Sequence, residues 1–572
     1  MKLTCSKSKN AATYYVQKSV RIGNRTTSKM VERLGSIEEI KARCGDADPL
    51  EWAKEYTKKL TMAEKESKQE ILIRHSASRL IDKNVRRSAN VGYLFLQGIY
   101  HSLGLDRICA EISERYKFEY DLNDILSMLV YTRILFPGSK RSSLQQAQSF
   151  LEMPTCKLHQ VYRGLEILSK ENDFFQAQLY KNSGKVLHRN TGVLYYDCTN
   201  YYFEIEEEDD FRKYGISKEH RPNPIVQMGL FMDADGIPLS FSVFGGNENE
   251  QPSMTPLEKK IVHDYGMSNF VVCTDAGLSS TGNRKFNNIG NRKFVTTQSI
   301  KKLKTFLQDF SLADEGWHLE GSDKLYKLSE LDKDADFNKS FYKDRWITED
   351  GLEQHLIITF SLKYKRYQQT IRTRQLERAK KLVANPSKLN TKHANDPKRL
   401  VKQNHCTGDG EVADKTQTCI DEAQVALEEK YDGFYAVCTN LEDDAPAIVK
   451  INQRRWEIEE CFRIMKSEFE ARPVFLSRRD RITAHFMTCF TALIIFRILE
   501  KKLADQYTCE EIIRTLKNMN MLIYPGDGYA PEYTRTDLTD ALHDAFGFRT
   551  DYEIVSQKNM RKNYMATRKG TK

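Results

Sequence analysis

The sequence predicts an α/β fold, because short apolar runs typical of buried strands alternate with stretches of helical length and periodicity. Two further observations point to a catalytic core: an aspartate lies at the end of each of two such strands, and a later helical stretch carries a glutamate between two cations. The chain has 572 residues, of which 40% are hydrophobic, so it is long enough for several domains with real cores.

Two aspartates lie at the ends of predicted strands. Val193–Cys198 is an apolar run with Asp197 near its end, and Phe270–Thr274 is a second run that Asp275 follows directly. Short β-branched and aromatic runs between turn residues predict buried strands. A carboxylate in this place faces solvent or a ligand, although a single Asp after a strand is more often a turn or capping residue.

The order of the elements around these aspartates favours a site. It reads as three strands, a helix, a strand, a helix and a strand, with carboxylates after the first and fourth strands. This is the layout of a ribonuclease-H-like core, whose final helix is expected to carry a third carboxylate. The elements between and after the aspartates are the strands Ile225–Phe231 and Leu239–Phe244, the helix Thr255–Tyr265 and the strand Phe294–Thr297.

The third carboxylate is expected on the helix-compatible stretch Ile451–Glu470. Arg455, Glu459 and Lys466 follow one another at spacings of four and seven residues. At about 100° per residue, all three project from one stripe of a helix. A carboxylate between two cations suits a site for metal and phosphate, whereas the ordinary alternative is an i,i+4 ion pair on a buried-edge helix.

With these motifs, the chain resembles the DDE transposases of bacterial insertion sequences, in particular the group with a Tyr-x2-Arg-x3-Glu-x6-Lys signature. The resemblance covers essentially the whole chain. The matching residues are Asp197 in DCT, Asp275 in TDAGLSS, and Arg455, Glu459 and Lys466 in RRWEIEECFRIMK. The position of the signature tyrosine is occupied by Asn452.

The resemblance implies an enzyme that binds terminal inverted repeats and performs metal-dependent DNA strand cleavage and strand transfer. Asp197, Asp275 and Glu459 would hold two Mg²⁺ or Mn²⁺ ions, hard cations that take oxygen ligands. Arg455 and Lys466 would contact phosphates of the transposon end, and Asn452 would also lie at the DNA. The expected partners are duplex DNA, as transposon ends and target, and a second copy of the chain in a homodimer.

The net charge of the whole chain does not indicate a nucleic-acid partner, but the charge of one segment does. The whole chain has 88 Lys and Arg against 79 Asp and Glu, which is mildly basic. The segment Lys363–Lys402 has thirteen Lys or Arg and two acids. Such a one-sided block indicates contact with a polyanion, with Arg372 and Arg374 as candidate DNA-binding residues, although a basic helix can also be a solvated face.

The N-terminal half is predicted to be mainly helical. Residues 1–75 begin with a hairpin and continue into a charged helix that starts with the capping box Ser36–Glu39. Residues 76–185 are helical, and in the resembling family this half binds the inverted repeats. Lys140, Arg141 and Arg163 are candidate phosphate contacts.

The 183 residues between Asp275 and Glu459 exceed what a core needs. We therefore expect core residues 186–300 and 431–505 to be interrupted by an insertion domain at 301–430, followed by a C-terminal region at 506–572. Leu356–Phe360 predicts sheet in the insertion, while Gly433–Thr439 fits either the last core strand or the end of the insertion.

Two tryptophans of the insertion, Trp317 and Trp346, are candidates for stacking on a displaced base. Members of the resembling group often release their ends through a DNA hairpin, which requires a base outside the stack. The alternative, that both tryptophans fill the core of the insertion, is the commoner role for such residues.

The remaining features favour the bacterial cytoplasm, at the nucleoid, and no membrane. The twelve cysteines are dispersed without a Cys-x2-Cys motif, and from the opening MKLTCSKSKN we expect no secretory leader. The apolar run Phe486–Phe496 is shorter than the roughly 20 residues of a membrane span and predicts a core helix. Two other functions stay open: a structure-selective nuclease on the same core, and a catalytically silent DNA-binding protein derived from a transposase.

Overall fold

The computed structural model describes residues 1–8, 11–22, 25–45, 48–67, 73, 75–384, 397–406 and 415–570. The chain divides into two compact units. The first consists of Met1–Arg87, Leu522–Pro531 and Asp551–Met560, and the second of Ser88–Met521, Glu532–Thr550 and Arg561–Lys572. Each unit is described by itself.

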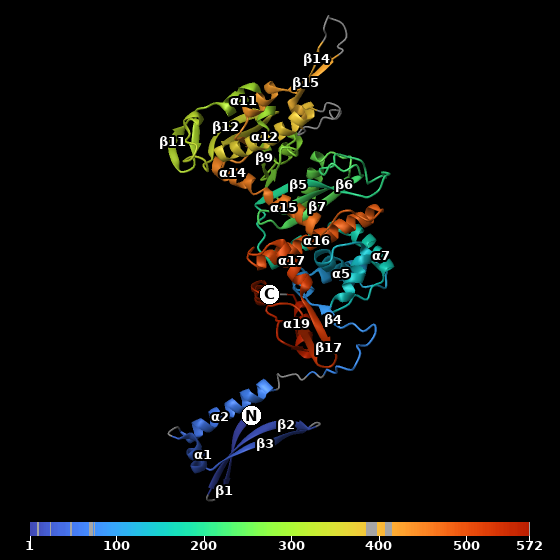
Figure 1. Ribbon diagram of the computed structural model, residues 1–572, viewed down its shortest axis with the longest axis vertical. Coiled ribbons are helices and arrows are strands. Elements are labelled where there is room, and N and C mark those ends of the chain that lie inside the picture. The colour runs from blue at the N-terminus through green and yellow to red at the C-terminus, as the bar shows by residue number, and fades with distance from the viewer. Residues whose placement is uncertain are drawn as a thin grey trace. The chain divides into compact units, whose positions relative to one another are not determined.

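The first unit begins with a three-stranded antiparallel sheet, where a hairpin was predicted. The strands β1 (Lys2–Ser8), β2 (Ala11–Ile22) and β3 (Arg25–Gly35) pair in that order and are followed by α1 (Ile37–Cys44) and α2 (Pro49–Ser67) (Figure 1). Val16 and Leu34 of the sheet pack on Ile40 and Ala53 of the helices. The predicted capping box is confirmed, since Ser36 and Glu39 exchange backbone-to-side-chain hydrogen bonds at the start of α1.

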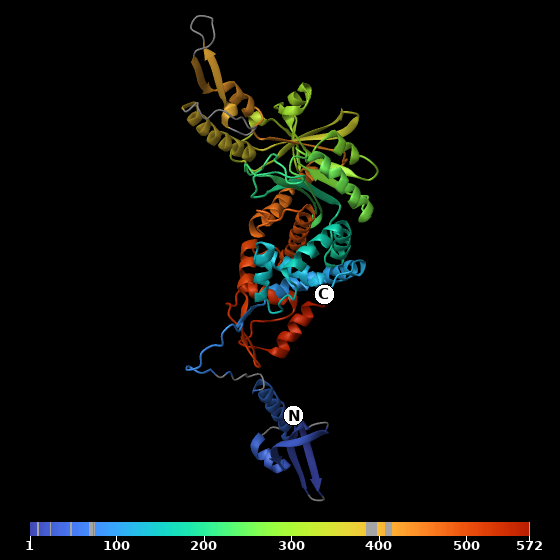
Figure 2. The ribbon, with the colours of Figure 1, turned by 90° about the vertical axis from the view of Figure 1, so that its right-hand side faces the viewer.

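Helices dominate the start of the second unit, as predicted. They pack around α16 (Arg479–Lys502), and in Figures 1 and 2 they appear in blue and cyan beside it. By length and hydropathy α16 could cross a membrane, but 94% of its most apolar window is buried inside the protein. The helices are α3 (Tyr93–Ser102), α4 (Leu105–Arg115), α5 (Leu122–Leu135), α6 (Lys140–Gln146), α7 (Leu158–Lys170) and α8 (Asn172–Val186).

A ten-stranded mixed sheet forms the centre of the second unit, in the order β11-β10-β12-β13-β16-β9-β8-β5-β6-β7. β5 pairs with β8 and β8 with β9 in parallel, and the other pairs are antiparallel. All the strands predicted between residues 193 and 297 are present. The bounds are β5 (Val193–Tyr202), β6 (Ile225–Asp233), β7 (Pro238–Gly245), β8 (Val271–Thr274), β9 (Lys293–Gln298), β10 (Trp317–Leu319), β11 (Ser322–Tyr326), β12 (Phe341–Glu349), β13 (Leu352–Phe360) and β16 (Phe434–Thr439).

Strands β10 to β13 of residues 301–430 extend this same sheet (Figures 1 and 2). The other two strands of this segment, Val401–Cys406 and Lys415–Ile420, pair with each other in a separate two-stranded sheet. The sequence left open whether β16 is the last core strand or the end of the insertion, and the strand borders both regions. Thr439 pairs with Val295 of β9 on one side and with His355 of β13 on the other. A single strand therefore joins the region of the aspartates to the segment predicted as an insertion.

The two faces of β5 meet different helices because its side chains alternate. Leu194, Tyr196 and Cys198 face α9 (Met254–Asp264) and belong to one core cluster with it. The odd-numbered residues face the other way, where Tyr201 lies 4.7 Å from Phe486 of α16 between ring centroids. Asp197 shares this second face.

The remaining elements complete the chain. They are β4 (Ser88–Asn90), α10 (Thr281–Phe286), α11 (Thr305–Leu312), α12 (Leu362–Ala384), β14 (Val401–Cys406), β15 (Lys415–Ile420), α13 (Glu422–Glu429), α14 (Ala445–Gln453), α15 (Trp456–Arg463), α17 (Cys509–Asn518), β17 (Asn520–Tyr524), β18 (Gly528–Pro531), α18 (Asp537–Phe546), β19 (Val555–Ser556) and α19 (Gln557–Thr567), with 3-10 turns at Ala147–Ser149, Gln251–Ser253, Ile300–Lys302, Leu328–Glu330 and Pro397–Leu400 and a π-helical turn at Ile464–Glu468.

Glu258 on α9 makes stability depend on pH. Its side chain is fully buried, Oε1 accepts a hydrogen bond of 2.8 Å from Asn287, and Oε2 has no partner in the described part of the chain. Burial raises its pKa from 4.5 to about 7, against the hydrogen bond from Asn287 and the charge of Arg292. The folded protein holds this proton more tightly than the unfolded chain, so stability falls as pH rises from 4.5 to about 7.

We therefore expect Glu258→Gln to raise the free energy of unfolding by about 2 kcal/mol at pH 8, allowing for one unpartnered amide donor. At pH 4 both side chains are neutral, so the gain disappears and only the cost of the unpartnered amide donor, roughly 1 kcal/mol, remains. Chemical denaturation at the two pH values measures it. A variant that gains nothing at pH 8 would contradict the raised pKa.

Candidate active site

The parallel pairing of β5 and β8 brings the two predicted aspartates together. Leu194 is in register with Val272 and Tyr195 with Cys273, and continuing this register by two residues places Asp197 beside Asp275. The prediction that both aspartates end strands is wrong for Asp197, which lies in the middle of β5. Pairing with β6 continues β5 past the point where β8 ends.

Asp197 has an unusually high proton affinity for a carboxyl group. Burial raises its pKa from 3.8 to about 6, Lys218 opposes this shift, and the charge of Asp275 adds to it. The charge of Asp275 thus makes ionisation of Asp197 less favourable, and a cation at this place would relieve the repulsion between the two.

Lys218 is a site residue that the sequence analysis missed. It lies in the loop between β5 and β6, where its ammonium donates to the carbonyl of Cys198 and lies 3.5 Å from Glu250. Burial lowers the pKa of Lys218, but the charges of Asp197 and Glu250 outweigh this effect and raise it. A lysine in an irregular loop carries no periodic signal that could have identified it.

The predicted single helix over Ile451–Glu470 is wrong. Helix α14 ends at Gln453, α15 begins at Trp456, and a π-helical turn occupies Ile464–Glu468. Tight hydrogen bonds to the third preceding residue, such as Arg455 N to Asn452 O at 3.3 Å, make the break. The stripe expected on one regular helix therefore comes from three consecutive segments.

Arg455 nevertheless links the three predicted carboxylates. Its guanidinium lies 3.8 Å from Glu459, one turn along α15. Burial lowers the pKa of Arg455, but the charges of Tyr435, Asp275, Asp197 and Glu459 outweigh burial and raise it. Its buried Nε has no hydrogen-bond partner among the residues that the structure describes. The Nε–H group of Arg455 can therefore donate a hydrogen bond to a further acceptor.

Lys466 reaches the same region from the π-helical turn. Its ammonium lies 3.2 Å from Glu219, which also pairs with Arg472. Burial lowers the pKa of Lys466 to about 8, the charge of Lys218 lowers it further, and Asp197 raises it. Two lysines from different segments therefore lie near Asp197.

Glu459 is the outlying member of the predicted triad. Its side chain is 62% exposed and turned toward Arg455. Within the part of the chain that the structure describes, no group of three His, Cys, Asp or Glu side chains could hold an ion as it stands. Asp197 and Asp275 fit a hard divalent cation as adjacent oxygen donors, and Glu459 would complete the set after turning from Arg455.

Asn452, at the position of the signature tyrosine, is buried, with 6% of its surface exposed. Its amide donates a 2.9 Å hydrogen bond to the hydroxyl of Tyr435 on β16, which lies 2.6 Å from the hydroxyl of Thr297. Tyr435, which the sequence analysis missed, lines a cavity of about 400 Å³ together with Asn452, Arg455 and Glu459. A phenolic hydroxyl is thus present beside Asn452, from a strand and not from the helix.

Among the N-terminal residues predicted to contact phosphate, Lys140 does not fit that role. It is 5% exposed and its ammonium lies 3.2 Å from Nδ1 of His485, so its side chain is not on the surface, where the predicted contact with DNA phosphates requires it. Burial and the charge of Arg133 lower its pKa to about 7. Arg141 and Arg163 are exposed, and their contact with DNA stays a prediction.

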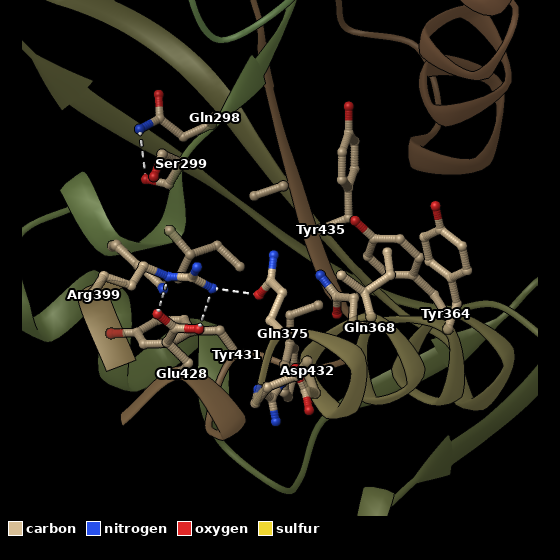
Figure 3. A pocket seen from close by; sticks show the side chains of 17 residues that line it. Gln298, Ser299, Tyr364, Gln368, Gln375, Arg399, Glu428, Tyr431, Asp432 and Tyr435 are labelled. Carbon is tan, nitrogen blue, oxygen red and sulfur yellow. Dashed lines mark hydrogen bonds and ion pairs between the residues drawn. The ribbon is translucent and has the colours of Figure 1, made fainter. Parts of the chain in front are cut away.

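The two DNA-binding candidates of the basic segment Lys363–Lys402 also differ in exposure. Arg372 on α12 is 6% exposed and pairs with Asp432 and Glu429, so its predicted DNA contact does not agree with this position. Figure 3 shows the cavity of about 400 Å³ that it lines, where Arg399 pairs with Glu428. Arg374 is exposed. Residues 385–396 of the segment lie outside the described residues.

The two tryptophans differ. Trp317 is fully buried and its indole N–H donates to the carbonyl of Ala313 at 3.0 Å, so it fills the core, as the alternative interpretation held. Trp346 on β12 is 44% exposed and stacks on His355 with ring centroids 5.0 Å apart.

The fold and this cluster define an α/β protein whose carboxylates and cations gather on one face of its sheet. Residues 198–495, more than half of the chain, match the transposase DDE domain family, and the chain belongs to this family. The match begins one residue after Asp197. This finding confirms the resemblance to DDE transposases at the level of the family.

A solved structure described as a cryo-EM structure of the piggyBac transposase synaptic complex with hairpin DNA is also similar to the chain. The TM-score is 0.36 with 10% sequence identity, over 83% of this chain and 84% of that chain. No curated protein matches the sequence.

Proposed function

We propose that this protein is the transposase of a bacterial insertion sequence and that it cuts and joins DNA strands at the ends of that element. The observation that carries the proposal is the juxtaposition of Asp197 and Asp275 at neighbouring parallel strands, with Arg455 close to both and to Glu459. Membership of the transposase DDE domain family adds independent support.

In this proposal the three carboxylates hold two Mg²⁺ or Mn²⁺ ions, which would supply an activated water or 3′-hydroxyl and neutralise charge at the phosphate. Asp197 and Asp275 bind from adjacent strands, and Glu459 joins them by turning away from Arg455. The guanidinium of Arg455, once released, donates from its unpartnered Nε to a phosphate oxygen of the DNA.

Lys466 and Lys218 act beside the carboxylates as cations. Lys466 is assigned to a phosphate near the scissile bond, and its place near Asp197 supports this role. The ammonium of Lys218 balances the charge of Asp197 in the protein described here. Asn452 orients the hydroxyl of Tyr435 at the rim of the same cavity.

The proposal extends to the partners. We assign the protein to the group of transposases with the Tyr-Arg-Glu-Lys signature, with Asn452 in the tyrosine position. Terminal inverted repeats and target DNA are the substrates of cut-and-paste transposition, a homodimer assembles on them, and the complex acts at the nucleoid.

The test is cleavage of a labelled duplex copied from the boundary between the gene's flanking inverted repeat and its neighbouring DNA. We expect nicking at the repeat end in Mg²⁺ or Mn²⁺, no nicking in excess EDTA, and binding but little cutting in Ca²⁺. Undiminished cleavage in excess chelator would rule out the mechanism.

Two outcomes would select the other functions. Cleavage of branched DNA without preference for the repeat end, and without joining to a target duplex, would indicate a structure-selective nuclease. Binding of the repeat with no cleavage in any divalent ion would indicate a silent DNA-binding protein.

A further inference from the structure

The loop between β5 and β6, residues 203–224, carries the opposite charge from that expected beside a site for DNA. It contains seven Asp or Glu and four Lys or Arg. Five of these acids are exposed: Glu204, Glu206, Glu207, Glu208 and Asp210. A surface with an excess of carboxylates repels the phosphates of DNA. In the arrangement described here, the loop therefore opposes the binding of DNA.

One turn of this loop brings two charged side chains to the candidate active site. The backbone N–H of His220 donates to the carbonyl of Ser217 at 3.1 Å and closes the turn. His220 has a φ of 55°, a left-handed conformation that residues other than glycine rarely adopt. The two residues between them point to the site: Lys218 donates to the carbonyl of Cys198 on β5, and Glu219 pairs with two cations.

Glu219 holds these two cations through a single oxygen. Its Oε1 lies 3.2 Å from the ammonium of Lys466, on the π-helical turn, and the same oxygen pairs with the guanidinium of Arg472, which follows that turn along the chain. The side chains of Lys466, Glu219 and Arg472 are 13%, 23% and 24% exposed. Ammonium and guanidinium groups are the usual donors to a phosphate oxygen. We call the position between Lys466 and Arg472 the anion position.

The anion position lies on the same face of the sheet as Asp197. The ammonium of Lys466 is 5.5 Å from the ring centroid of Tyr201, and side chains of β5 alternate, so Tyr201 and Asp197 share one face of the strand. Lys466 is also the cation assigned above to a phosphate near the scissile bond. The carboxylate of Glu219 therefore occupies a position that the proposed function reserves for a phosphate oxygen.

Little apolar packing holds the turn in this arrangement. Ile216, directly before it, is 92% exposed, and Tyr214 is 47% exposed. The loop is fastened to β6 by a backbone bridge between Lys213 and Ile225, and Asn200 donates to the carbonyl of Ile216 at 3.1 Å. Segments with few buried apolar contacts open at a low cost in free energy. We therefore expect the turn to move more easily than the sheet beside it.

We propose that Glu219 takes the place of a DNA phosphate at the anion position, so that the turn at residues 217–220 keeps this position closed until DNA displaces it. The inference rests on the proposed function in that DNA is the substrate. It adds Arg472 as a contact to phosphate and Glu219 as the internal competitor of the DNA. A strand of DNA offers several phosphates to the surrounding cations, whereas Glu219 offers one carboxylate, so DNA can replace it.

The test compares Glu219→Gln with Glu207→Gln in the full chain. Both changes remove one negative charge from the loop, and Glu207 is an exposed acid outside the turn. Binding of the labelled repeat-end duplex is measured by fluorescence anisotropy in Ca²⁺, in which little cutting is expected. We expect Glu219→Gln to bind roughly tenfold more tightly than wild type, and Glu207→Gln to bind within about twofold of wild type.

Arg472 shows whether the gain comes from the anion position. Added to Glu219→Gln, Arg472→Ala should remove most of the gain, whereas Arg472→Lys keeps the charge and should retain most of it, which separates a lost contact from a damaged fold. A gain that persists undiminished in Glu219→Gln/Arg472→Ala would overturn the assignment of Arg472. Equal gains in Glu219→Gln and Glu207→Gln would mean that the loop acts through its net charge alone, and the proposal would be wrong.

The two proposals fail in different ways. If the wild-type protein nicks the repeat end in Mn²⁺ but Glu219→Gln binds the duplex like wild type, this inference is wrong and the proposed function stands. If the wild-type protein never nicks repeat ends but Glu219→Gln gains affinity that depends on Arg472, the proposed function is wrong and the anion position stands. Failure of every variant to bind the duplex would contradict both.

Discussion

Asp275→Asn is expected to lower strand cleavage roughly 1000-fold or more while leaving DNA binding intact. Asparagine keeps the shape of the side chain and can still accept the 3.0 Å hydrogen bond from the backbone of Leu278. It removes the charge that a divalent ion needs, so the loss falls on catalysis and not on folding. Cleavage of the labelled repeat end and its binding, measured on the same preparation, separate the two.

Asp197→Asn and Glu459→Gln should give the same pattern, because the three carboxylates act as one set and removing any of them removes most of the activity. Asp443→Asn is the matched control, since Asp443 is exposed and lies outside the candidate site. A Glu459→Gln protein that cuts at the normal rate would show that Glu459 is not one of the metal-binding carboxylates, and the proposed site would then lack its third ligand.

The strands around the aspartates could be predicted because each is a compact apolar run with turn residues at its ends. Phe270–Thr274 corresponds to β8 with one residue less at its start, and Val193–Cys198 corresponds to the first part of β5, which continues to Tyr202. What the pattern could not give was the length of β5. Its polar residues Thr199 and Asn200 are buried by pairing with β6, and such burial depends on a strand that follows more than twenty residues later.

The break between α14 and α15 was hidden for a related reason. The apolar positions Ile451, Ile458 and Phe462 keep a helical period through Arg454 and Arg455, so the sequence pattern continues where the backbone does not. Tertiary packing overrides local propensity here. The hydroxyl of Tyr195 donates to the carbonyl of Ile451 at 2.9 Å, a contact between residues 256 positions apart.

Buried cations were the other source of error. Lys140 and Arg372 are predicted to contact DNA, but each is covered by distant segments, at His485 and at Asp432. Burial of a charged side chain occurs where it is paired or hydrogen-bonded, and the partner cannot be identified from local sequence. The same limit explains why Lys218 and Tyr435 were missed.

Arg455→Ala is expected to lower strand cleavage by roughly 100-fold and, in contrast to the carboxylate variants, to strengthen Mn²⁺ binding. The charge of Arg455 acts on Asp275, Asp197 and Glu459 together, and its ion pair holds Glu459 at 3.8 Å. Removing this cation frees Glu459 and makes the site more negative, so the Kd for Mn²⁺ should fall severalfold, whereas Asp197→Asn should raise it.

Calorimetric titration of Mn²⁺ into each variant, beside the cleavage assay, measures these opposite signs. Arg454→Ala is the matched control, because this neighbouring arginine pairs with Glu457 at 3.1 Å and should affect neither quantity by more than about twofold. Arg455→Lys keeps the charge but loses the forked donor, so it should leave Mn²⁺ affinity near wild type and restore only part of the cleavage. Weaker Mn²⁺ binding in Arg455→Ala would mean that Arg455 organises the carboxylates, and its assignment to a DNA phosphate would then be wrong.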